Sequence, residues 1–475
     1  MTESEAAVES EVSRQPQGAW AVLSVVTGAL FLEGIDIAML NVAVPSIAAD
    51  IGLETGSAHW VISAYVLAYA GFMILGGRAA DVLGRRRVFL SALAVFAVFS
   101  AIGGFAQESW LLILVRFITG ATAGFMTPAG FSLLTTTFPE GARRNKALAV
   151  YGAIGASGFL LGVVVGGLFT SVDWRLVFFA PALLGFGFLV AGRFFIVRDG
   201  ADPHDQARVS FDLAGGATLT AAMVSLIYGI VTLGEDTSNT LGLIAFGVAI
   251  ALASAFIVIE KRAEDPLIPE GVLTTGLLPW ATSVGLLFIG AFFAWQFVLT
   301  LYLQDLLGWR PLQTGIAFAA MGIELVIAPF LTPRLAARFG NVVVMVVGLG
   351  AVTIGFALTL RLDRDSGFSD LLPSLLLLGV AFAFIYGPLT AAAVEGVKDE
   401  KHGVAGGIVY TGFQFGAALG VSMATVVLVG GGNGTPSVDD YQRALTVPAV
   451  AAGLALFIGL LLVVRQRMNV NQDAG

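Results

Sequence analysis

Several residue types that support common protein chemistries are missing or scarce in this sequence. None of the 475 residues is cysteine, which excludes disulfides, iron–sulfur clusters and thiol nucleophiles. The three histidines, His59, His204 and His402, are too far apart to form a metal-ligand pattern, so we expect no metal site. Charged residues make up 12% of the chain, whereas about 25% is usual in soluble domains. The net charge of −8 argues against a nucleic-acid partner.

Apolar residues are abundant instead, at 57% of the chain with a mean hydropathy of +0.88. A chain of this composition uses lipid as the solvent for much of its surface. A membrane-spanning helix needs about 20 mostly apolar residues. Fourteen stretches meet this need, and they begin near Ala19, His59, Val88, Trp110, Ala147, Leu176, Leu213, Leu241, Trp280, Leu312, Val342, Leu371, Gly403 and Ala444. We therefore expect an all-α membrane protein with 14 transmembrane helices.

The distribution of basic residues predicts the orientation of these helices. With the N-terminus inside, five of the 25 Lys and Arg residues fall outside and Arg116 lies within a span, while the rest are cytoplasmic. We expect a multi-pass protein of the cell membrane with both termini in the cytoplasm. The predicted segments are a cytoplasmic tail (1–18), a six-helix half (19–198), two inserted helices with their loops (199–276), a second six-helix half (277–468) and a final tail (469–475).

Two features recur at nearly the same offset and indicate an internal repeat. Glycines at spacing four occur at 158, 162 and 166 and again at 412, 416 and 420, 254 residues later. The loop "GGRAADVLGRRR" from Gly76 has a weakly similar counterpart in "PRLAARFGN". In this counterpart Gly340 corresponds to Gly84, 256 residues earlier. We interpret the chain as two pseudo-symmetric halves, although glycine is common in membrane helices and chance stays an alternative. The glycines Gly158, Gly162, Gly166 and Gly167 predict a close helix contact, either static or sliding.

Acidic residues inside predicted spans are candidates for proton coupling. Such residues are energetically costly in a membrane and usually functional. Glu33 and Asp36 share one face of the first span, where both cannot easily be ionised, so one is expected to hold a proton. Arg116 is the expected cationic partner, and Glu324 is a further candidate. A purely structural ion pair remains the alternative.

The loop that begins at Gly76 combines flexibility with charge. Gly77 and Gly84 allow a tight turn, and Asp81 can accept hydrogen bonds from a helix N-terminus. Arg85 and Arg86 can pair with acids such as Glu140 or Glu395. We interpret the loop as a gating element. The alternative is that its arginines only enforce the topology.

These motifs resemble those of the major facilitator superfamily, and in particular its fourteen-helix drug:proton antiporters. The loop of Gly77, Asp81, Gly84, Arg85 and Arg86 resembles the loop-2/3 signature, "VRFITG" from Val115 the fourth-helix motif, and "IDIAMLNVAVPSI" from Ile35 the first-helix motif. The segments "DWRLVFF" from Asp173 and "LYLQDLLGWRPLQTG" from Leu301 are also similar to that family. "GVVVGG" from Gly162 resembles the fifth-helix antiporter motif, with Val163 where the family usually has proline and Thr119 where the fourth-helix motif has glutamine.

The resemblance implies a proton-coupled exporter of hydrophobic or cationic organic compounds, of the multidrug efflux type, working by alternating access. By the resemblance, Asp81 contacts the helix that starts near Gly403. An exporter of a specific metabolite, lipid or siderophore is the alternative. We expect no enzyme activity and no cofactor besides the proton gradient, since no nucleotide-binding loop occurs. The expected partners are a small-molecule substrate, protons and the lipid bilayer, and the expected state is a monomer. Candidate cavity residues are Trp295, Gln296, Tyr386 and Gln414.

Overall fold

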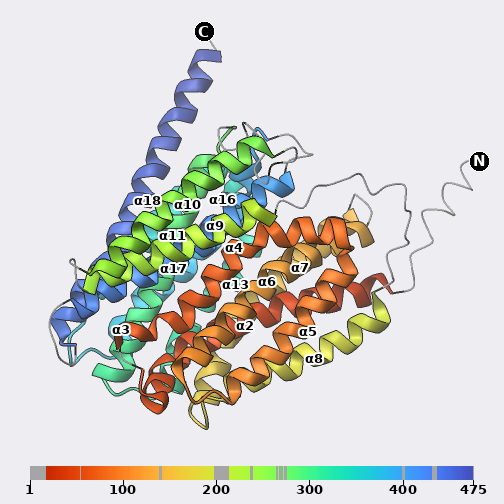
Figure 1. The fold of residues 1–475 in the computed structure, drawn as a ribbon. Helices are drawn as coiled ribbons and strands as arrows, with labels where there is room; N and C mark the ends of the chain where they lie inside the picture. The colour runs from red at the N-terminus through yellow and green to blue at the C-terminus, as the bar shows by residue number, and fades with distance from the viewer. Residues whose placement is uncertain are drawn as a thin grey trace, which may run out of the picture.

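The computed structural model is a bundle of helices, and no strand occurs in the residues it describes (Figure 1). Those residues are 18–53, 55–138, 142–196, 213–235, 239–263, 266, 271, 275–397, 402–430 and 436–473. The helices of the first half are α2 (Ala19–Ile51), α3 (Thr55–Ala58), α4 (Trp60–Leu83), α5 (Arg85–Gly104), α6 (Ser109–Thr137), α7 (Ala142–Thr170) and α8 (Leu176–Phe195).

The central and second-half helices follow in the same order along the chain. The central pair is α9 (Leu213–Glu235) and α10 (Thr240–Arg262). The second half contains α11 (Leu278–Leu301) with a π-helical end η2 (Tyr302–Leu306), then α12 (Pro311–Phe318), the 3₁₀ turn η3 (Ala319–Ile323), α13 (Glu324–Phe330), α14 (Thr332–Phe339), α15 (Asn341–Thr359), α16 (Phe368–Val394), α17 (His402–Val429) and α18 (Val438–Asp473).

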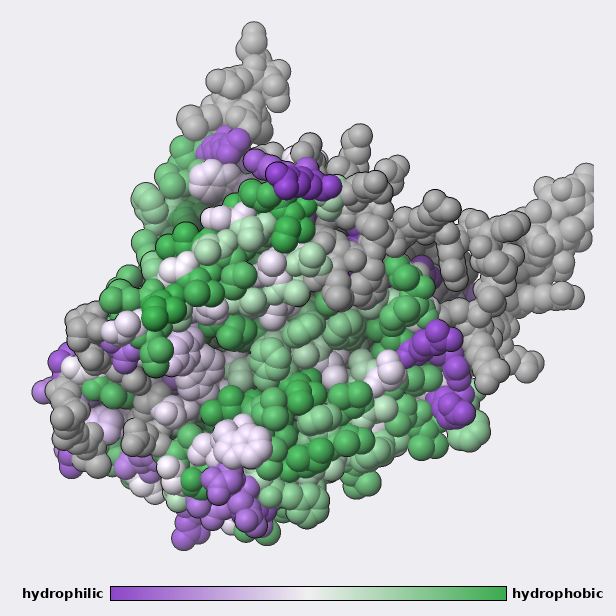
Figure 2. Space-filling view, viewed as in Figure 1, coloured by the Kyte–Doolittle hydropathy of each residue, from purple (hydrophilic) through white to green (hydrophobic). Residues whose placement is uncertain are grey.

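The surface of this bundle is that of a membrane protein. Within the described residues, 11 helices are long and apolar enough to cross a membrane. The other three predicted spans fall on α4, α7 and α9, which contain shorter apolar runs. Figure 2 shows a largely hydrophobic face, with hydrophilic residues gathered toward its two ends. A belt of this kind matches the hydrocarbon layer of a bilayer.

Four glycines show that the two halves share a backbone pattern. Gly52 ends α2 with φ 69°, and Gly308, 256 residues later, follows η2 with φ 68°. Gly84 separates α4 from α5 with φ 93°, and Gly340 separates α14 from α15 with φ 84°. Residues with a side chain rarely adopt such positive φ values. The same two turns at one offset support the predicted repeat.

Closely packed glycines join equivalent helix pairs in each half. A Cβ atom at Gly162 would lie 2.8 Å from the Ile35 Cα atom, and one at Gly166 would lie 2.5 Å from the Met39 Cα atom. In the second half, a Cβ atom at Gly416 would lie 2.1 Å from the Leu286 carbonyl oxygen. The glycines at spacing four therefore pack α7 on α2 and α17 on α11.

The two central helices differ in their surroundings. Helix α9 packs against both α4 and α17, so it touches both halves. A Cβ atom at Gly71 of α4 would lie 2.5 Å from the Thr220 hydroxyl of α9, which shows how closely the two helices approach. Helix α10 packs on α9 and exposes most of its apolar residues, as at Leu243 and Ile250. We conclude that α10 faces lipid and that α9 fills a position between the halves.

The halves touch each other from the middle of the bundle toward the end at which α2 terminates. A Cβ atom at Gly167 of α7 would lie 2.6 Å from the Pro311 carbonyl oxygen of α12. Near the same end, the Gln304 amide donates a hydrogen bond of 2.9 Å to the Val42 carbonyl. The Phe159 ring of α7 contacts the Phe292 ring of α11 at a centroid distance of 5.7 Å.

The predicted span from Leu312 is not a continuous helix. It is divided into α12, η3, α13 and α14, with the change from 3₁₀ to α geometry at Glu324. Its counterpart in the first half, α4, is continuous from Trp60 to Leu83. A 3₁₀ segment inside a helix is a common mark of a hinge or of strain.

Candidate functional site

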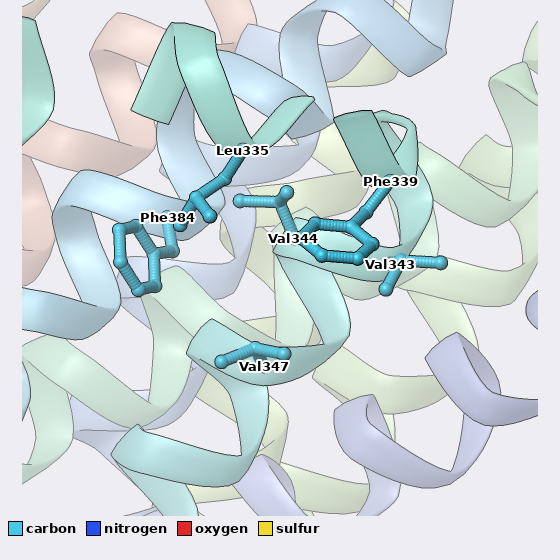
Figure 3. Close-up of a pocket in the computed structure, with 6 residues that line it drawn as sticks. All are labelled: Leu335, Phe339, Val343, Val344, Val347 and Phe384. Carbon is cyan, nitrogen blue, oxygen red and sulfur yellow. The ribbon is translucent and has the colours of Figure 1, made fainter. Parts of the chain in front are cut away.

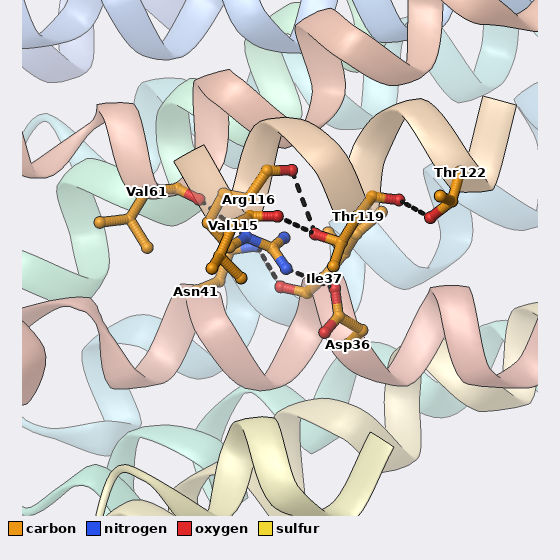
Figure 4. Close-up of polar contacts among 8 residues, drawn as sticks. All are labelled: Asp36, Ile37, Asn41, Val61, Val115, Arg116, Thr119 and Thr122. Carbon is orange, nitrogen blue, oxygen red and sulfur yellow. Dashed lines mark hydrogen bonds and ion pairs between the residues drawn. The ribbon is translucent and has the colours of Figure 1, made fainter. Parts of the chain in front are cut away.

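An ion pair between Asp36 and Arg116 lies in the centre of the first half (Figure 4). The Arg116 Nη1 atom is 2.7 Å from Asp36 Oδ2, and the two residues are 1% and 0% exposed. Arg116 Nε also donates to the Val61 carbonyl at 3.1 Å, and its guanidinium carbon lies 4.3 Å from the centre of the Tyr65 ring. Helices α2, α4 and α6 thus meet at one charged group, as the sequence predicts for Asp36 and Arg116.

Small residues of α6 allow this close meeting. A Cβ atom at Gly120 would lie 2.1 Å from the Tyr65 carbonyl oxygen, and one at Gly124 would lie 2.9 Å from the Tyr69 carbonyl oxygen. The last glycine of "VRFITG" is therefore needed where α6 crosses α4. Any side chain there would separate the two helices that hold Arg116.

The polar neighbours of the pair bond to backbone carbonyls of their own helices and leave one carboxylate oxygen of Asp36 unbonded. The Thr119 hydroxyl hydrogen-bonds to the carbonyls of Val115 and Arg116, and the Asn41 amide donates to the Ile37 carbonyl, as Figure 4 shows. Asp36 Oδ1 has no hydrogen-bond partner among the described residues. The arginine is therefore the principal group that balances the Asp36 charge.

Glu33 lies one turn before Asp36 but has different partners. It is 3% exposed. The Tyr69 hydroxyl lies 2.9 Å from Glu33 Oε2, and the Thr127 hydroxyl lies 2.8 Å from Oε1 and 2.7 Å from Oε2. The two acids that the sequence places on one helix face are thus held by separate groups, a cation for Asp36 and neutral hydroxyls for Glu33.

Glu324 lies apart from these residues, in the second half. It is the first residue of α13, directly after the 3₁₀ turn, and it is half-buried. Among the described residues, no hydrogen bond or ion pair is recorded for its carboxylate. The change from 3₁₀ to α geometry therefore lies directly beside this acid.

A second charged cluster joins helix ends at the end of the bundle where α2 terminates. Arg175 Nη1 is 2.9 Å from Asp50 Oδ2, and the Trp174 indole donates to the same oxygen at 2.9 Å. The Arg175 guanidinium also lies 4.4 Å from the centre of the Trp174 ring. These residues of the "DWRLVFF" segment attach the turn between α7 and α8 to the end of α2.

The loop between α4 and α5 is anchored to a third helix of its own half. Arg86 donates to the carbonyls of Ile196 and Arg193, at 2.7 and 3.0 Å, and so satisfies the C-terminal end of α8. Among the described residues, no ion pair joins Arg85 or Arg86 to Glu395, which is exposed.

Some expectations for this loop concern groups that the structure does not describe. The Asp81 side chain and its expected contact near Gly403 lie outside the description, as does Glu140. Gly77 has only Pro128 nearby, at 3.8 Å from an added Cβ atom. Gly76 is the crowded glycine, since its Cβ atom would lie 2.3 Å from the Gly124 carbonyl oxygen.

Comparison with known proteins decides the family. The model of the Major Facilitator Superfamily matches residues 26–421 and 283–471. The chain belongs to the major facilitator superfamily. It is therefore a membrane transporter and not an enzyme.

Relatives in this superfamily match almost the whole chain. The puromycin resistance protein pur8 of Streptomyces alboniger is 32% identical over 96% of this chain and 92% of its own length. The cephamycin export protein CmcT of Amycolatopsis lactamdurans is 33% identical over 86% and 84%. The multidrug efflux pump LfrA of Mycolicibacterium smegmatis is 27% identical over 92% and 84%.

Solved structures agree on the superfamily fold. An autoinhibited peptide transporter of the POT family superposes with a TM-score of 0.65 at 15% identity, over 94% of this chain and 96% of the other. The human organic anion transporter MFSD10 gives 0.63 at 18% identity, over 94% and 100%. At such low identity, these similarities concern the fold alone.

Two departures from the superfamily motifs have visible structural consequences. Val163, in place of proline, is fully buried in α7, and a Cβ atom at Gly315 of α12 would lie 2.6 Å from its carbonyl oxygen. Thr119 stands in place of glutamine, and its hydroxyl hydrogen-bonds to backbone carbonyls of its own helix. Neither residue contacts the Asp36 carboxylate through a recorded hydrogen bond.

The predicted cavity residues of this transporter have different environments. Trp295 is fully buried and packs on Phe318 and Phe356, at ring distances of 5.8 and 5.6 Å. Gln296 is 0% exposed, and its amide has no hydrogen-bond partner among the described residues. Gln414 is half-buried.

Tyr386 is the predicted cavity residue that reaches solvent, at 37% exposure. Its hydroxyl lies 3.0 Å from that of Tyr410, which is 36% exposed, and both rings contact Phe413. Tyr410 and Phe413 had not been predicted, although both lie near the glycines at spacing four in α17. Tyr386 and Tyr410 therefore form an accessible aromatic surface, which is backed by the buried ring of Phe413.

An apolar pocket of about 200 Å³ lies between α14, α15 and α16 (Figure 3). Its walls are formed by Leu335, Phe339, Val343, Val344, Val347 and Phe384. Phe339 and Val347 are 51% and 56% exposed, so the pocket opens to the surface of the bundle. It contains no group that could bind a proton, and its chemistry suits contact with lipid acyl chains.

Proposed function

We propose that this transporter exports hydrophobic or cationic organic compounds in exchange for protons, by alternating access. The names of its relatives support export, since they include a puromycin resistance protein, a cephamycin export protein and a multidrug efflux pump. The transporter works without a cofactor, as a monomer in the lipid bilayer, and the proton gradient supplies the energy.

The proposed topology has fourteen spans, as in the fourteen-helix drug:proton antiporters. The 11 long apolar helices and the three shorter apolar runs in α4, α7 and α9 support this number. Most basic residues fall on one side of such a topology, which favours the cell membrane with both termini in the cytoplasm. In that orientation the halves touch toward the outer end and the structure is inward-facing.

The observation that carries the proposal is the set of charged groups inside the first half. Asp36 and Arg116 are fully buried at 2.7 Å, and Glu33 lies one helical turn away. Charged groups in a membrane interior are costly and usually serve ion or proton movement. In the conformation described, Asp36 is paired with Arg116, and this pairing favours the ionised form of the carboxyl group. It takes up a proton only when helix movement separates it from Arg116.

The accessible aromatic surface of Tyr386 and Tyr410, backed by Phe413, is the proposed contact for substrate. Aromatic faces attract organic cations as well as flat apolar molecules. Glu324, half-buried at the start of α13, is a further candidate contact for a cationic group. This combination suits cationic amphipathic compounds.

An exporter that is selective for one compound is the second candidate, and the names of some relatives favour it. Several are named for one compound, such as puromycin, cephamycin and lincomycin. A thermal-shift screen of the purified protein separates the candidates, with cationic dyes, tetracyclines, lipids and siderophores as ligands. Stabilisation by many unrelated compounds supports multidrug export, and stabilisation by one chemical series supports a dedicated exporter.

Transport in liposomes tests the coupling. Wild-type protein should move ethidium against its concentration gradient only when a pH gradient is imposed. Asp36→Asn should let ethidium move down its gradient and should abolish uphill movement. Asp365→Asn, at an exposed loop acid, is the control and should behave as wild type. Uphill movement that continues in Asp36→Asn would rule out Asp36 as a coupling residue.

A further inference from the structure

Three oxygen-bearing side chains from three helices meet around Glu33. They are Glu33 on α2, Tyr69 on α4 and Thr127 on α6. The Tyr69 and Thr127 hydroxyl oxygens are 2.6 Å apart, and each also lies within 2.9 Å of the Glu33 carboxyl group. The three groups therefore form a closed triangle, in which each group touches the other two.

Counting hydrogens in this triangle shows which form of Glu33 fits it. Each hydroxyl supplies one hydrogen, and an ionised carboxylate supplies none. Three contacts would then share two hydrogens, while Thr127 also lies 3.1 Å from the Ala123 carbonyl, a fourth acceptor. A protonated Glu33 supplies the third hydrogen. Glu33 Oε1–H can then donate to Thr127, Thr127 to Tyr69, and Tyr69 to Glu33 Oε2.

The surrounding charges are consistent with a neutral Glu33. Arg116, the basic residue within the predicted spans, is bound to Asp36 at 2.7 Å and also contacts the Val61 carbonyl and the Tyr65 ring. No recorded contact of Glu33 among the described residues involves a basic side chain. An unpaired ionised carboxylate with 3% exposure would be costly, whereas a carboxylic acid with two neutral hydrogen bonds is not.

The triangle is less deeply buried than the ion pair. Thr127 is half-buried and Tyr69 is 8% exposed, whereas Asp36 is 0% exposed. Of the two candidate proton sites, the triangle is therefore the more accessible one.

We propose that Glu33, Tyr69 and Thr127 form a proton site separate from the Asp36–Arg116 pair, loaded in this conformation. When α2, α4 and α6 move apart, the Glu33 O–H bond breaks and the proton passes to water. Tyr69 and Thr127 then keep their hydrogens and donate to the carboxylate. The inference rests on the proposed proton-coupled export, in which it assigns the site that carries a proton while Asp36 stays ionised.

Infrared difference spectroscopy on the purified full-length protein tests the site directly. The carbonyl stretch of a protonated carboxylic acid is separate from that of a carboxylate. We expect a protonated band in wild type at neutral pH that is lost in Glu33→Gln and retained in Asp36→Asn. Tyr69→Phe and Thr127→Val each remove one hydrogen-bonding hydroxyl, so both should shift this band without abolishing it. A band that persists in Glu33→Gln would overturn the proposal.

Transport measurements separate this proposal from the function on which it rests. One outcome is that Glu33→Gln loses the band but wild type never moves ethidium with a pH gradient. This result would reject proton-coupled export and keep the assignment of Glu33 as a protonated site. If wild type is proton-driven and Glu33→Gln transports uphill as well as wild type does, the site has no part in coupling. We expect Glu33→Gln to lose uphill movement. Tyr69→Phe, which keeps the carboxyl group, should retain part of it.

Discussion

The two halves of this transporter share turns and helix contacts but differ in the side chains at their centres. Residue 36 of α2 is an aspartate paired with Arg116, whereas residue 292 of α11, 256 positions later, is a phenylalanine in contact with Phe382. Glu33 similarly corresponds to Ile289. The first half therefore contains the buried charges and the second half contains a core of aromatic rings. The glycines at the turns and helix contacts are the same in both halves, whereas the side chains at the centre of each half differ.

The largest effect should come from breaking the charge pair of the first half. Arg116→Ala leaves Asp36 buried without its cation, and loss of one partner of a buried pair costs about 3–5 kcal/mol. We expect a large drop in the unfolding temperature of the purified protein and no transport. Phe382→Leu in the aromatic core keeps an apolar side chain and should cost much less.

A double substitution checks that charge is the cause. Arg116→Gln with Asp36→Asn removes both charges, so it should recover much of the stability lost in Arg116→Ala but none of the proton-driven transport. If Arg116→Ala unfolds at the wild-type temperature, the pair does not support the first half.

The second prediction compares two neighbouring glycines with different partners. Gly162→Leu would force α7 away from α2 within the first half, and overpacking of this kind costs about 1–3 kcal/mol. Gly167→Ala should have a smaller effect on unfolding. Because Gly167 faces Pro311 of the other half, it should instead weaken the closed contact between halves and change the transport rate.

Gly187→Ala provides the control for both glycines, since nothing lies within 4 Å of an added Cβ atom there. Thermal unfolding and initial ethidium transport rates measure the two effects separately. If Gly162→Leu and Gly167→Ala had equal, mild effects, close packing of the α7 glycines against α2 would not be important for stability or transport.

The third prediction concerns the loop and its weakly similar counterpart. Asp81 corresponds to Ala337 in the second half, so the comparison predicts a function for the first loop alone. Asp81→Asn should strongly reduce transport while expression and substrate-induced thermal shift stay close to wild type. Ala337→Ser should leave all three unchanged. Wild-type transport by Asp81→Asn would leave only the topological role of the loop.

The smallest effect should come from the accessible aromatic surface of the second half. Tyr386→Phe removes one hydroxyl and its hydrogen bond with Tyr410, a change of about 0.5–1.5 kcal/mol. We expect a modest rise in the ethidium concentration for half-maximal transport. Tyr386→Ala, which also removes the ring, should have a larger effect. No difference between Tyr386→Ala and wild type would place substrate elsewhere.

Much of the fold could be predicted because lipid imposes strong constraints on sequence. Long apolar runs showed the spans, and the spacing of glycines showed which helices pack closely. Asp36 and Arg116 could be paired because charges are rare in spans and each needs a partner. Tyr69 and Thr127 could not be found in this way. Tyrosine and threonine carry no comparable penalty, and only the crossing of α2, α4 and α6 brings them to Glu33.

The break in the span that starts near Leu312 was also beyond prediction. The 3₁₀ turn Ala319–Ile323 contains no proline, and its sequence is as apolar as its neighbours. Packing of this segment against α16 and α7 accompanies the change in helix geometry. Likewise, Gly167 belongs to the same short motif as Gly162, yet the rotation of the helix turns it toward the other half.

The contact of Gly167 with α12 also makes the motion of this transporter measurable. Because the chain contains no cysteine, the natural sequence is already a clean background for site-directed labelling. Spin labels at Leu168 on α7 and Ile316 on α12, which are 48% and 57% exposed, would flank this contact without filling it. The distribution of their separations would report how often this end of the bundle opens.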